Sequence, residues 1–94
     1  MEFGLFVEFP SREGATQAQI FKDSMELIEA AEESGSEGIW LAEYHFDPGR
    51  SVLSAPVTVA GAVAARTKRV KIGLAVHVLP LRNPIQIAEE IATL

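Results

Sequence analysis

The chain has 94 residues, of which 48% are hydrophobic and 22% are charged, and this balance is typical of a folded globular domain. Its formal net charge of −5 argues against nucleic acid or an anionic membrane as a partner, and no apolar run reaches the roughly 18 residues of a membrane span. Because cysteine is absent, disulfide and thiolate chemistry are excluded, which is compatible with the cytoplasm, where we expect the protein to work.

The first part of the chain predicts a strand followed by an amphipathic helix. The strand is expected over residues 2–8, and a loop from Pro10 to Ala15 follows it. A helix is expected to begin at Thr16, because Gln19 three positions later completes a capping-box pattern. Gly35 is placed to end that helix. The apolar face predicted for this helix consists of Ile20, Ser24, Leu27, Ile28 and Ala31.

The same pattern occurs twice more. A second strand is expected over residues 37–43, and its helix begins near Pro56, a residue suited to a first helical turn. A third strand is expected over residues 70–78. The last helix opens at Asn83 and Pro84, with asparagine as the cap and proline at the first helical position.

Three similar units in succession predict part of a larger barrel. If Leu5, Trp40 and Leu74 are placed in register, the units repeat after about 35 and then about 34 residues, close to the βα unit of an eightfold barrel. A parallel sheet of three strands leaves two edges unpaired. We therefore expect an α/β fold made of the first three βα units of a TIM-like (β/α)8 barrel, with residues 1–94 in one domain. It would be incomplete alone, and the remainder of the barrel or a homo-oligomer would complete it.

A candidate site lies where the second strand ends. Glu43, Tyr44 and His45 follow one another there, and the sites of parallel α/β proteins lie beyond the carboxyl ends of the strands. In an extended chain Glu43 and His45 share one side and Tyr44 points to the other. A carboxylate beside an imidazole suits proton transfer near neutral pH. The alternative is that Glu43 and Tyr44 cap a neighbouring element while His45 is a packing residue.

Other residues give weaker indications. His77, near the end of the third strand, is able to approach His45, although a histidine bonded to a carbonyl is the more ordinary interpretation. His45 and His77 with Glu43 or Asp47 also suggest a metal-dependent barrel enzyme. No glycine-rich phosphate loop is present. Five aromatic side chains either line a planar ligand or belong to the core: Phe3, Phe6, Phe9, Trp40 and Phe46.

Three segments give the chain a family resemblance. It resembles the N-terminal part of the bacterial luciferase-like flavin-dependent monooxygenases in residues 1–6, 38–46 and 72–80, with Arg82-Asn83-Pro84 and a helix after them. The resemblance implies a TIM-like barrel that binds reduced FMN, or in one branch F420, at the carboxyl ends of its strands. It also implies frequent dimerisation.

The resemblance also assigns roles to residues. Family members commonly have histidine at the position of Tyr44, where it is the catalytic base of the luciferase branch, whereas His45 matches the active-site histidine of the F420 branch. A cis peptide is implied between Ala75 and Val76. The expected catalytic residues are His45, Glu43 and Tyr44, with Tyr44 donating a hydrogen bond. The residues expected to line the flavin are Phe6, Ala75, Val76 and His77.

The function implied is that of a monooxygenase acting on a small organic substrate with O2 and reduced flavin, which a separate flavin reductase supplies. Because the family's flavin phosphate is held by later barrel units, we expect this chain alone to bind FMN weakly or not at all. Two alternatives stay open: a non-catalytic or truncated flavin-binding relative, which Tyr44 favours, and the metal-dependent barrel enzyme.

Overall fold

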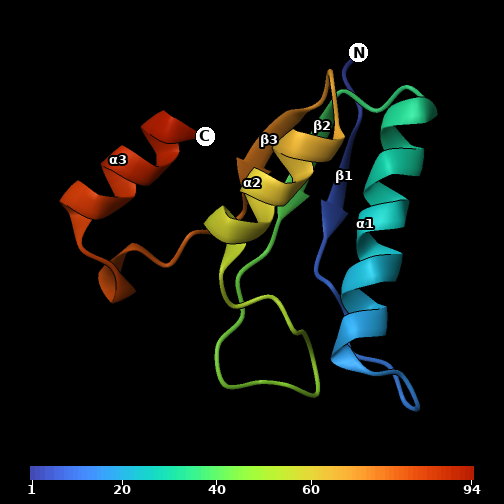
Figure 1. Ribbon diagram of the computed structural model, residues 1–94, viewed down its shortest axis with the longest axis horizontal. Helices are drawn as coiled ribbons and strands as arrows, with labels where there is room; N and C mark the ends of the chain where they lie inside the picture. The colour runs from blue at the N-terminus through green and yellow to red at the C-terminus, as the bar shows by residue number, and fades with distance from the viewer.

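The computed structural model describes all residues from 1 to 94 and consists of three consecutive βα units (Figure 1). The strands pair in the order β1-β2-β3, and both pairings are parallel. This confirms the predicted α/β class with a parallel sheet. In chain order the elements are β1 (Gly4–Val7), α1 (Gln17–Glu33), β2 (Gly38–Leu41), α2 (Pro56–Arg66), β3 (Lys71–Leu74), a 3-10 turn η1 (Leu79–Leu81) and α3 (Pro84–Thr93).

The helices begin and end where the capping residues predicted. The Thr16 side chain accepts a hydrogen bond from the backbone N–H of Gln19 at 3.2 Å. The side chain of Asn83 does the same for Ile85 at 2.9 Å. Gly35 has a φ of 97°, a left-handed conformation that costs glycine little. Local chemistry therefore determined these helix boundaries.

The strands are shorter than expected. Residues 2–8, 37–43 and 70–78 were predicted, and four residues of each are in the sheet. The third prediction was wrong by the widest margin, because the chain leaves the sheet after Leu74. The peptide bond between Ala75 and Val76 is cis, as the family resemblance implied. Periodicity missed this end of the strand because apolar residues continue on both sides of His77, at positions 75, 76, 78 and 79.

The predicted register was wrong by one residue. Trp40 was expected to pair with Leu5 and Leu74, but it pairs with Phe6 and Gly73. Leu5 pairs instead with Ile39, and Leu74 with Leu41. In a strand, a shift of one residue moves a side chain to the other face of the sheet. Trp40 therefore lies on the face opposite to that of Ile39 and Leu41.

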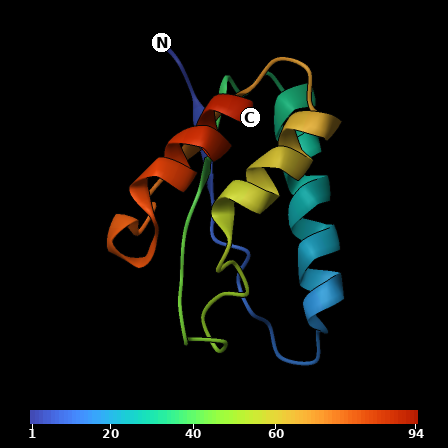
Figure 2. The ribbon, with the colours of Figure 1, turned by 60° about the vertical axis from the view of Figure 1, so that its left-hand side comes forward.

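The core lies between the sheet and two helices. Helices α1 and α2 cover the same face of the sheet (Figures 1 and 2). Leu27 was predicted to face this core but is 52% exposed, whereas Met25 is buried. The buried stripe of α1 runs through residues 20, 24, 25 and 28, so Leu27 lies at its edge. The core consists of Val7, Phe9, Ile20, Met25, Ile28, Ile39, Leu41, Leu53, Ala60 and Val63.

The other face of the sheet is open, and Trp40 lies across it. A Cβ atom added to Gly73 would overlap Cε3 and Cζ3 of the indole, and one added to Gly4 would lie 3.1 Å from Nε1. The indole therefore spans from β1 to β3, over positions that have no side chain. Trp40 is still 49% exposed, because nothing covers its outer surface.

The close approach of Trp40 to Gly73 yields a stability prediction. Gly73→Ala should lower the free energy of unfolding by about 1 to 3 kcal/mol, because the added methyl group overpacks the contact. Urea unfolding followed by circular dichroism measures this. The matched control is Gly61→Ala in α2, where an added Cβ meets nothing within 4 Å; it should stabilise the protein by about 0.5 to 1 kcal/mol. If Trp40→Ala did not relieve the cost of Gly73→Ala, the contact would not be its cause.

Helix α3 lies beside β3 and apart from α1 (Figure 1), and it contributes no buried residue. Its N-terminus follows η1, so the segment from Ala75 to Asn83 forms the whole connection from β3 to α3. None of the helices combines the length and the apolar character needed to cross a bilayer.

Candidate active site

A buried carboxylate joins two histidines at the carboxyl ends of β2 and β3. The side chain of Glu43 is 0% exposed, and its Oε1 lies 2.5 Å from Nε2 of His45. Its Oε2 lies 2.6 Å from Nδ1 of His77 and 2.9 Å from the backbone nitrogen of Val78. We call Glu43, His45 and His77 the histidine cluster.

The hydrogen bonds of this cluster determine its charge. Burial raises the pKa of Glu43, but hydrogen bonds from His45, from the Val78 backbone and from His77 outweigh that effect and hold the pKa below its ordinary value. Glu43 is therefore ionised at neutral pH and only accepts hydrogen bonds. Consequently His45 carries a proton on Nε2 and His77 one on Nδ1. The other ring nitrogen of His77, Nε2, is buried and has no hydrogen-bond partner.

The sheet brings these residues together. Leu41 pairs with Leu74, and the backbone N–H of Ala75 donates to the carbonyl of Leu41 at 2.8 Å. The chain then turns away, and His77 reaches Glu43 although 34 positions separate the two residues. The structure thus confirms that His77 comes close to His45, but through a shared carboxylate. The interpretation of His77 as bonded to a carbonyl is not supported.

Tyr44 points away from the histidine cluster and forms a second cluster. Its hydroxyl donates to Oε1 of Glu8 at 2.6 Å, and Arg50 Nη2 donates to the same oxygen at 2.8 Å. The guanidinium also lies 5.1 Å from the centroid of the Tyr44 ring, within the range of a cation–π contact. We call Glu8, Tyr44 and Arg50 the tyrosine cluster. It confirms that Tyr44 and His45 point in opposite directions.

Hydrogen bonds within the tyrosine cluster keep Glu8 ionised and Tyr44 protonated. Hydrogen bonds from Tyr44 and then from Arg50 lower the pKa of Glu8. The hydrogen bond to Glu8 raises the pKa of Tyr44, because the carboxylate favours the protonated phenol. The sequence analysis did not select Glu8 or Arg50. A signal for Glu8 was available, since it follows the first apolar run as Glu43 follows the second.

Three of the residues expected to line a flavin carry apolar groups on or near the open side of the sheet. Phe6 is 50% exposed and Val76 is 65% exposed, while Ala75 is half-buried. Of the two alternatives left open for the five aromatic side chains, Phe9 follows the second: it is fully buried in the core, with its ring centroid 5.4 Å from that of Phe21. The remaining aromatic side chains of that set, Phe3, Phe6, Trp40 and Phe46, are exposed.

The histidine cluster lends no support to a metal site. No group of three or more histidine, aspartate or glutamate side chains is positioned to hold a metal ion. Both oxygens of Glu43 already accept hydrogen bonds from the imidazoles. Asp47, the other carboxylate considered, is exposed in the following loop, where its backbone carbonyl accepts from the N–H of Arg50 at 3.0 Å.

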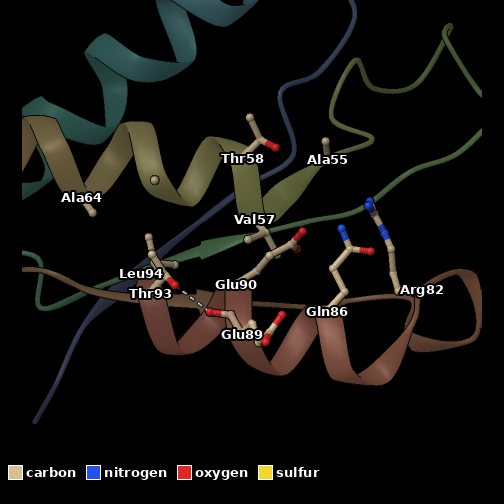
Figure 3. A pocket seen from close by; sticks show the side chains of 11 residues that line it. Ala55, Val57, Thr58, Ala64, Arg82, Gln86, Glu89, Glu90, Thr93 and Leu94 are labelled. Atoms are coloured by element: carbon tan, nitrogen blue, oxygen red, sulfur yellow. Dashed lines mark hydrogen bonds between the residues drawn. The ribbon is translucent and has the colours of Figure 1, made fainter.

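One hollow of the molecule lies away from this site. It is an open groove of about 750 Å³ between α2 and α3 (Figure 3). Side chains such as Thr58 and Gln86 line it from the two helices, and Arg82 lies at one end. None of the candidate catalytic or flavin-lining residues belongs to this groove. The chemistry of the candidate site is therefore defined by its hydrogen-bonded clusters and not by the size of a cavity.

The chain is similar to known proteins in sequence and in fold. A family model described as luciferase-like monooxygenase matches residues 1–94. Over 90 residues the chain is 34% identical to the alkanal monooxygenase beta chain of Photorhabdus laumondii, covering 96% of this chain and 28% of that one.

Two solved structures are also similar. Apo-MsnO8 superposes with a TM-score of 0.91 at 29% identity, covering 98% of this chain and 28% of that one. The FMN complex of the oxygenating constituent of 3,6-diketocamphane monooxygenase from Pseudomonas putida superposes with a TM-score of 0.87 at 25% identity, covering 97% and 25%. These neighbours have the TIM-barrel fold, which confirms the expected fold class. The chain spans about a quarter of the length of the relatives it matches.

Proposed function

The chain belongs to the luciferase-like monooxygenase family, and on this premise we propose that the protein is a flavin-dependent monooxygenase acting on a small organic substrate with O2. The observation that carries the proposal is the histidine cluster at the carboxyl ends of β2 and β3. It holds an imidazole beside an ionised, buried carboxylate. That arrangement is suited to moving protons near neutral pH.

The residues present fit a flavin. Nε2 of His77 is a buried polar atom without a partner, and an unpaired buried group of this kind costs about 1 to 3 kcal/mol. Ala75 and Val76 precede it with apolar surface, and Phe6 adds an exposed ring on β1. A flat ring with an apolar body and a polar edge suits both features. In our proposal Phe6, Ala75 and Val76 contact the ring and His77 binds its edge.

The cofactor proposed is reduced FMN, supplied by a separate flavin reductase, with F420 as the alternative. The relative solved with FMN supports FMN. We further propose that the protein acts in the cytoplasm and forms a homo-oligomer. A small aldehyde or ketone is the substrate class favoured by the names of the relatives, one an alkanal monooxygenase and the other a diketocamphane monooxygenase.

A bound reduced flavin supplies the electrons with which dioxygen is reduced. The proposed task of this chain's residues is to handle the protons. Glu43 holds the Nε2–H of His45, which leaves Nδ1 as the nitrogen that accepts a proton. The side chain of His45 is 25% exposed, so this nitrogen can exchange its proton with a ligand or with water. The carboxylate of Glu43 stabilises the imidazolium that results, so His45 is the proposed catalytic base and Glu43 orients it.

The test is the reoxidation of photoreduced FMN by O2 in the presence of the protein with its barrel complete. We expect binding that quenches the fluorescence of Trp40, the single tryptophan of residues 1–94, and reoxidation kinetics that differ from those of free FMN. Free FMN and FMN with serum albumin are the controls. Absence of both binding and any kinetic change, with FMN and with F420, would contradict the proposal.

One observation favours a second function. Tyr44 stands where the luciferase branch has its catalytic histidine, so the protein would be a flavin-binding relative without turnover. A turnover assay separates the two functions. It contains a flavin reductase and, as the substrate, either a long-chain aldehyde or a cyclic ketone. Oxygenated product formed only with the protein supports the monooxygenase. Flavin binding without product from any substrate supports the second function.

A further inference from the structure

The loop after His45 is held against the end of β1 along most of its length. The backbone N–H of Ser11 donates to the carbonyl of Arg50 at 3.0 Å, and that of Val52 donates to the carbonyl of Phe9 at 3.2 Å. Ser51 is buried, and its hydroxyl donates to the carbonyl of Glu8. These contacts are backbone or short side-chain bonds. The tyrosine cluster adds longer side chains, since Tyr44 and Arg50 both reach Glu8, the residue that directly follows β1.

We propose that the tyrosine cluster is a latch, in which the Tyr44 hydroxyl and Arg50, both bound to Glu8, hold residues 44–53 against the segment that follows β1 and thereby position His45. In this assignment Tyr44 is a positioning residue and does not contact the ligand. The assignment rests on the proposed function for the role of His45. It goes beyond that function because it gives a task to three residues that the proton chemistry leaves unused.

The hydrogen-bonding capacity of Tyr44 supports this assignment. A phenol has one proton to donate, and Tyr44 gives it to Glu8 at 2.6 Å. The phenolic oxygen also accepts from Arg50 Nη2 at 3.1 Å. Donation of a hydrogen bond to a flavin or substrate, which the sequence analysis expected, would require the bond to Glu8 to break. The ring is covered in addition by the guanidinium of Arg50.

The latch reaches His45 through the backbone. The N–H of Tyr44 donates to the carbonyl of Leu53 at 2.9 Å, so the main chain is held at residue 44 as well as at its side chain. On the other side of the same chain, Glu43 binds His45 and His77. The segment 43–45 is therefore held from two sides, by Glu8 and Leu53 on one side and by His77 on the other. If the Tyr44 side is released, His45 keeps its bond to Glu43 but loses the fixed backbone that aims its ring.

The first test uses the single tyrosine of the chain and needs no flavin. Absorbance at alkaline pH should show Tyr44 ionising above its ordinary pKa of 10.0, and Glu8→Gln should move the midpoint down toward that value. Hydrogen exchange of the Val52 and Ser11 amides should be about 3- to 10-fold faster in Tyr44→Phe. The matched control is Arg66→Ala, which removes an ion pair with Glu29 between α1 and α2. Unchanged exchange in Tyr44→Phe would overturn the latch.

The second test asks whether Tyr44 acts through His45. Tyr44→Phe should lower kcat by about 10-fold and leave the affinity for FMN unchanged. The expected loss of kcat is smaller than the 10²-fold that a misplacement of about 1 Å can cost. In a His45→Ala background, the same substitution should lower kcat by less than about 2-fold, because neighbours that act as one unit are not additive. Arg50→Lys should retain more activity than Arg50→Ala. An equal loss in both backgrounds, or a weaker affinity for FMN, would mean that Tyr44 contacts the ligand.

The outcomes of the two proposals are distinguishable. A protein that binds no flavin contradicts the proposed function, whereas the tyrosine titration and the hydrogen exchange still decide whether the latch exists. A protein that binds flavin and turns over, but whose loop exchanges unchanged in Tyr44→Phe, contradicts the latch alone.

Discussion

Replacement of Glu43 with alanine should lower the free energy of unfolding by about 3 to 5 kcal/mol, because it takes the acceptor from several hydrogen-bond donors and each buried donor left unpaired costs about 1 to 3 kcal/mol. The carboxylate has no exposed surface and accepts from His45, His77 and the N–H of Val78. Without it, these donors lose their common partner, and those that stay buried are left unpaired. The measurement is urea unfolding at pH 7, followed by circular dichroism.

The control for Glu43→Ala is Glu33→Ala, at an exposed position near the end of α1, which should change stability by no more than about 0.5 kcal/mol. Because a small domain has only a modest total stability, Glu43→Ala is also measured in a stabilised background, for which Gly61→Ala is available. A loss below about 1 kcal/mol for Glu43→Ala would contradict the role given to this carboxylate.

The pH dependence of stability isolates the charge of Glu43. Its pKa in the folded protein is below the ordinary value of 4.5, so its contribution to stability is complete above that pH and is lost as the pH falls through the folded value. The variant Glu43→Gln keeps the shape but carries no charge at any pH. The stability difference between wild type and Glu43→Gln should therefore shrink as the pH falls below 4.5. A difference that grows as the pH falls below 4.5 would contradict the assigned direction of the shift.

The second large effect concerns activity. His45→Ala should lower kcat of the proposed monooxygenase by about 10²- to 10⁴-fold, the usual contribution of a general acid or base. Its imidazole is the partly exposed member of the histidine cluster, with 25% of the side chain exposed against 9% for His77. It is therefore the one placed to exchange protons with a bound ligand. Steady-state turnover with a flavin reductase and a saturating aldehyde measures this effect.

A matched variant separates proton transfer from positioning. His45→Gln can still donate a hydrogen bond to Oε1 of Glu43 but cannot take up a proton. It should retain most of the stability and lose as much activity as His45→Ala. Added imidazole should restore part of the activity of His45→Ala and none to a Glu43→Ala protein. If His45→Gln were as active as wild type, proton transfer by His45 would be excluded.

Much of the fold could be predicted from local patterns. The caps at Thr16 and Asn83 and the glycine at position 35 act on adjacent residues, so they placed the helix ends correctly. The register failed because Ile39, Trp40 and Leu41 are all apolar, and alternation cannot show which of them faces the helices. The glycines opposite Trp40 decide it, since the indole needs a surface without side chains.

The candidate site was predicted less completely than the fold. The neighbours Glu43 and His45 were paired correctly, because two residues in alternation lie on one side of an extended chain. Tyr44 was correctly turned away from them, but its partner Glu8 lies 36 positions earlier and Arg50 lies in a loop. Neither partner follows from a local rule.

The sequence by itself determined three βα units, their helix ends, the family and the placement of His45 beside a carboxylate, because each of these depends on residues close together in the chain. Only the tertiary structure decided that Glu43 is shared by two histidines and that Tyr44 is bound to Glu8. Those contacts depend on which strands are neighbours and on where each strand ends. Parallel pairing places the ends of β1, β2 and β3 side by side, and the course of the chain beyond them selects the side chains that meet.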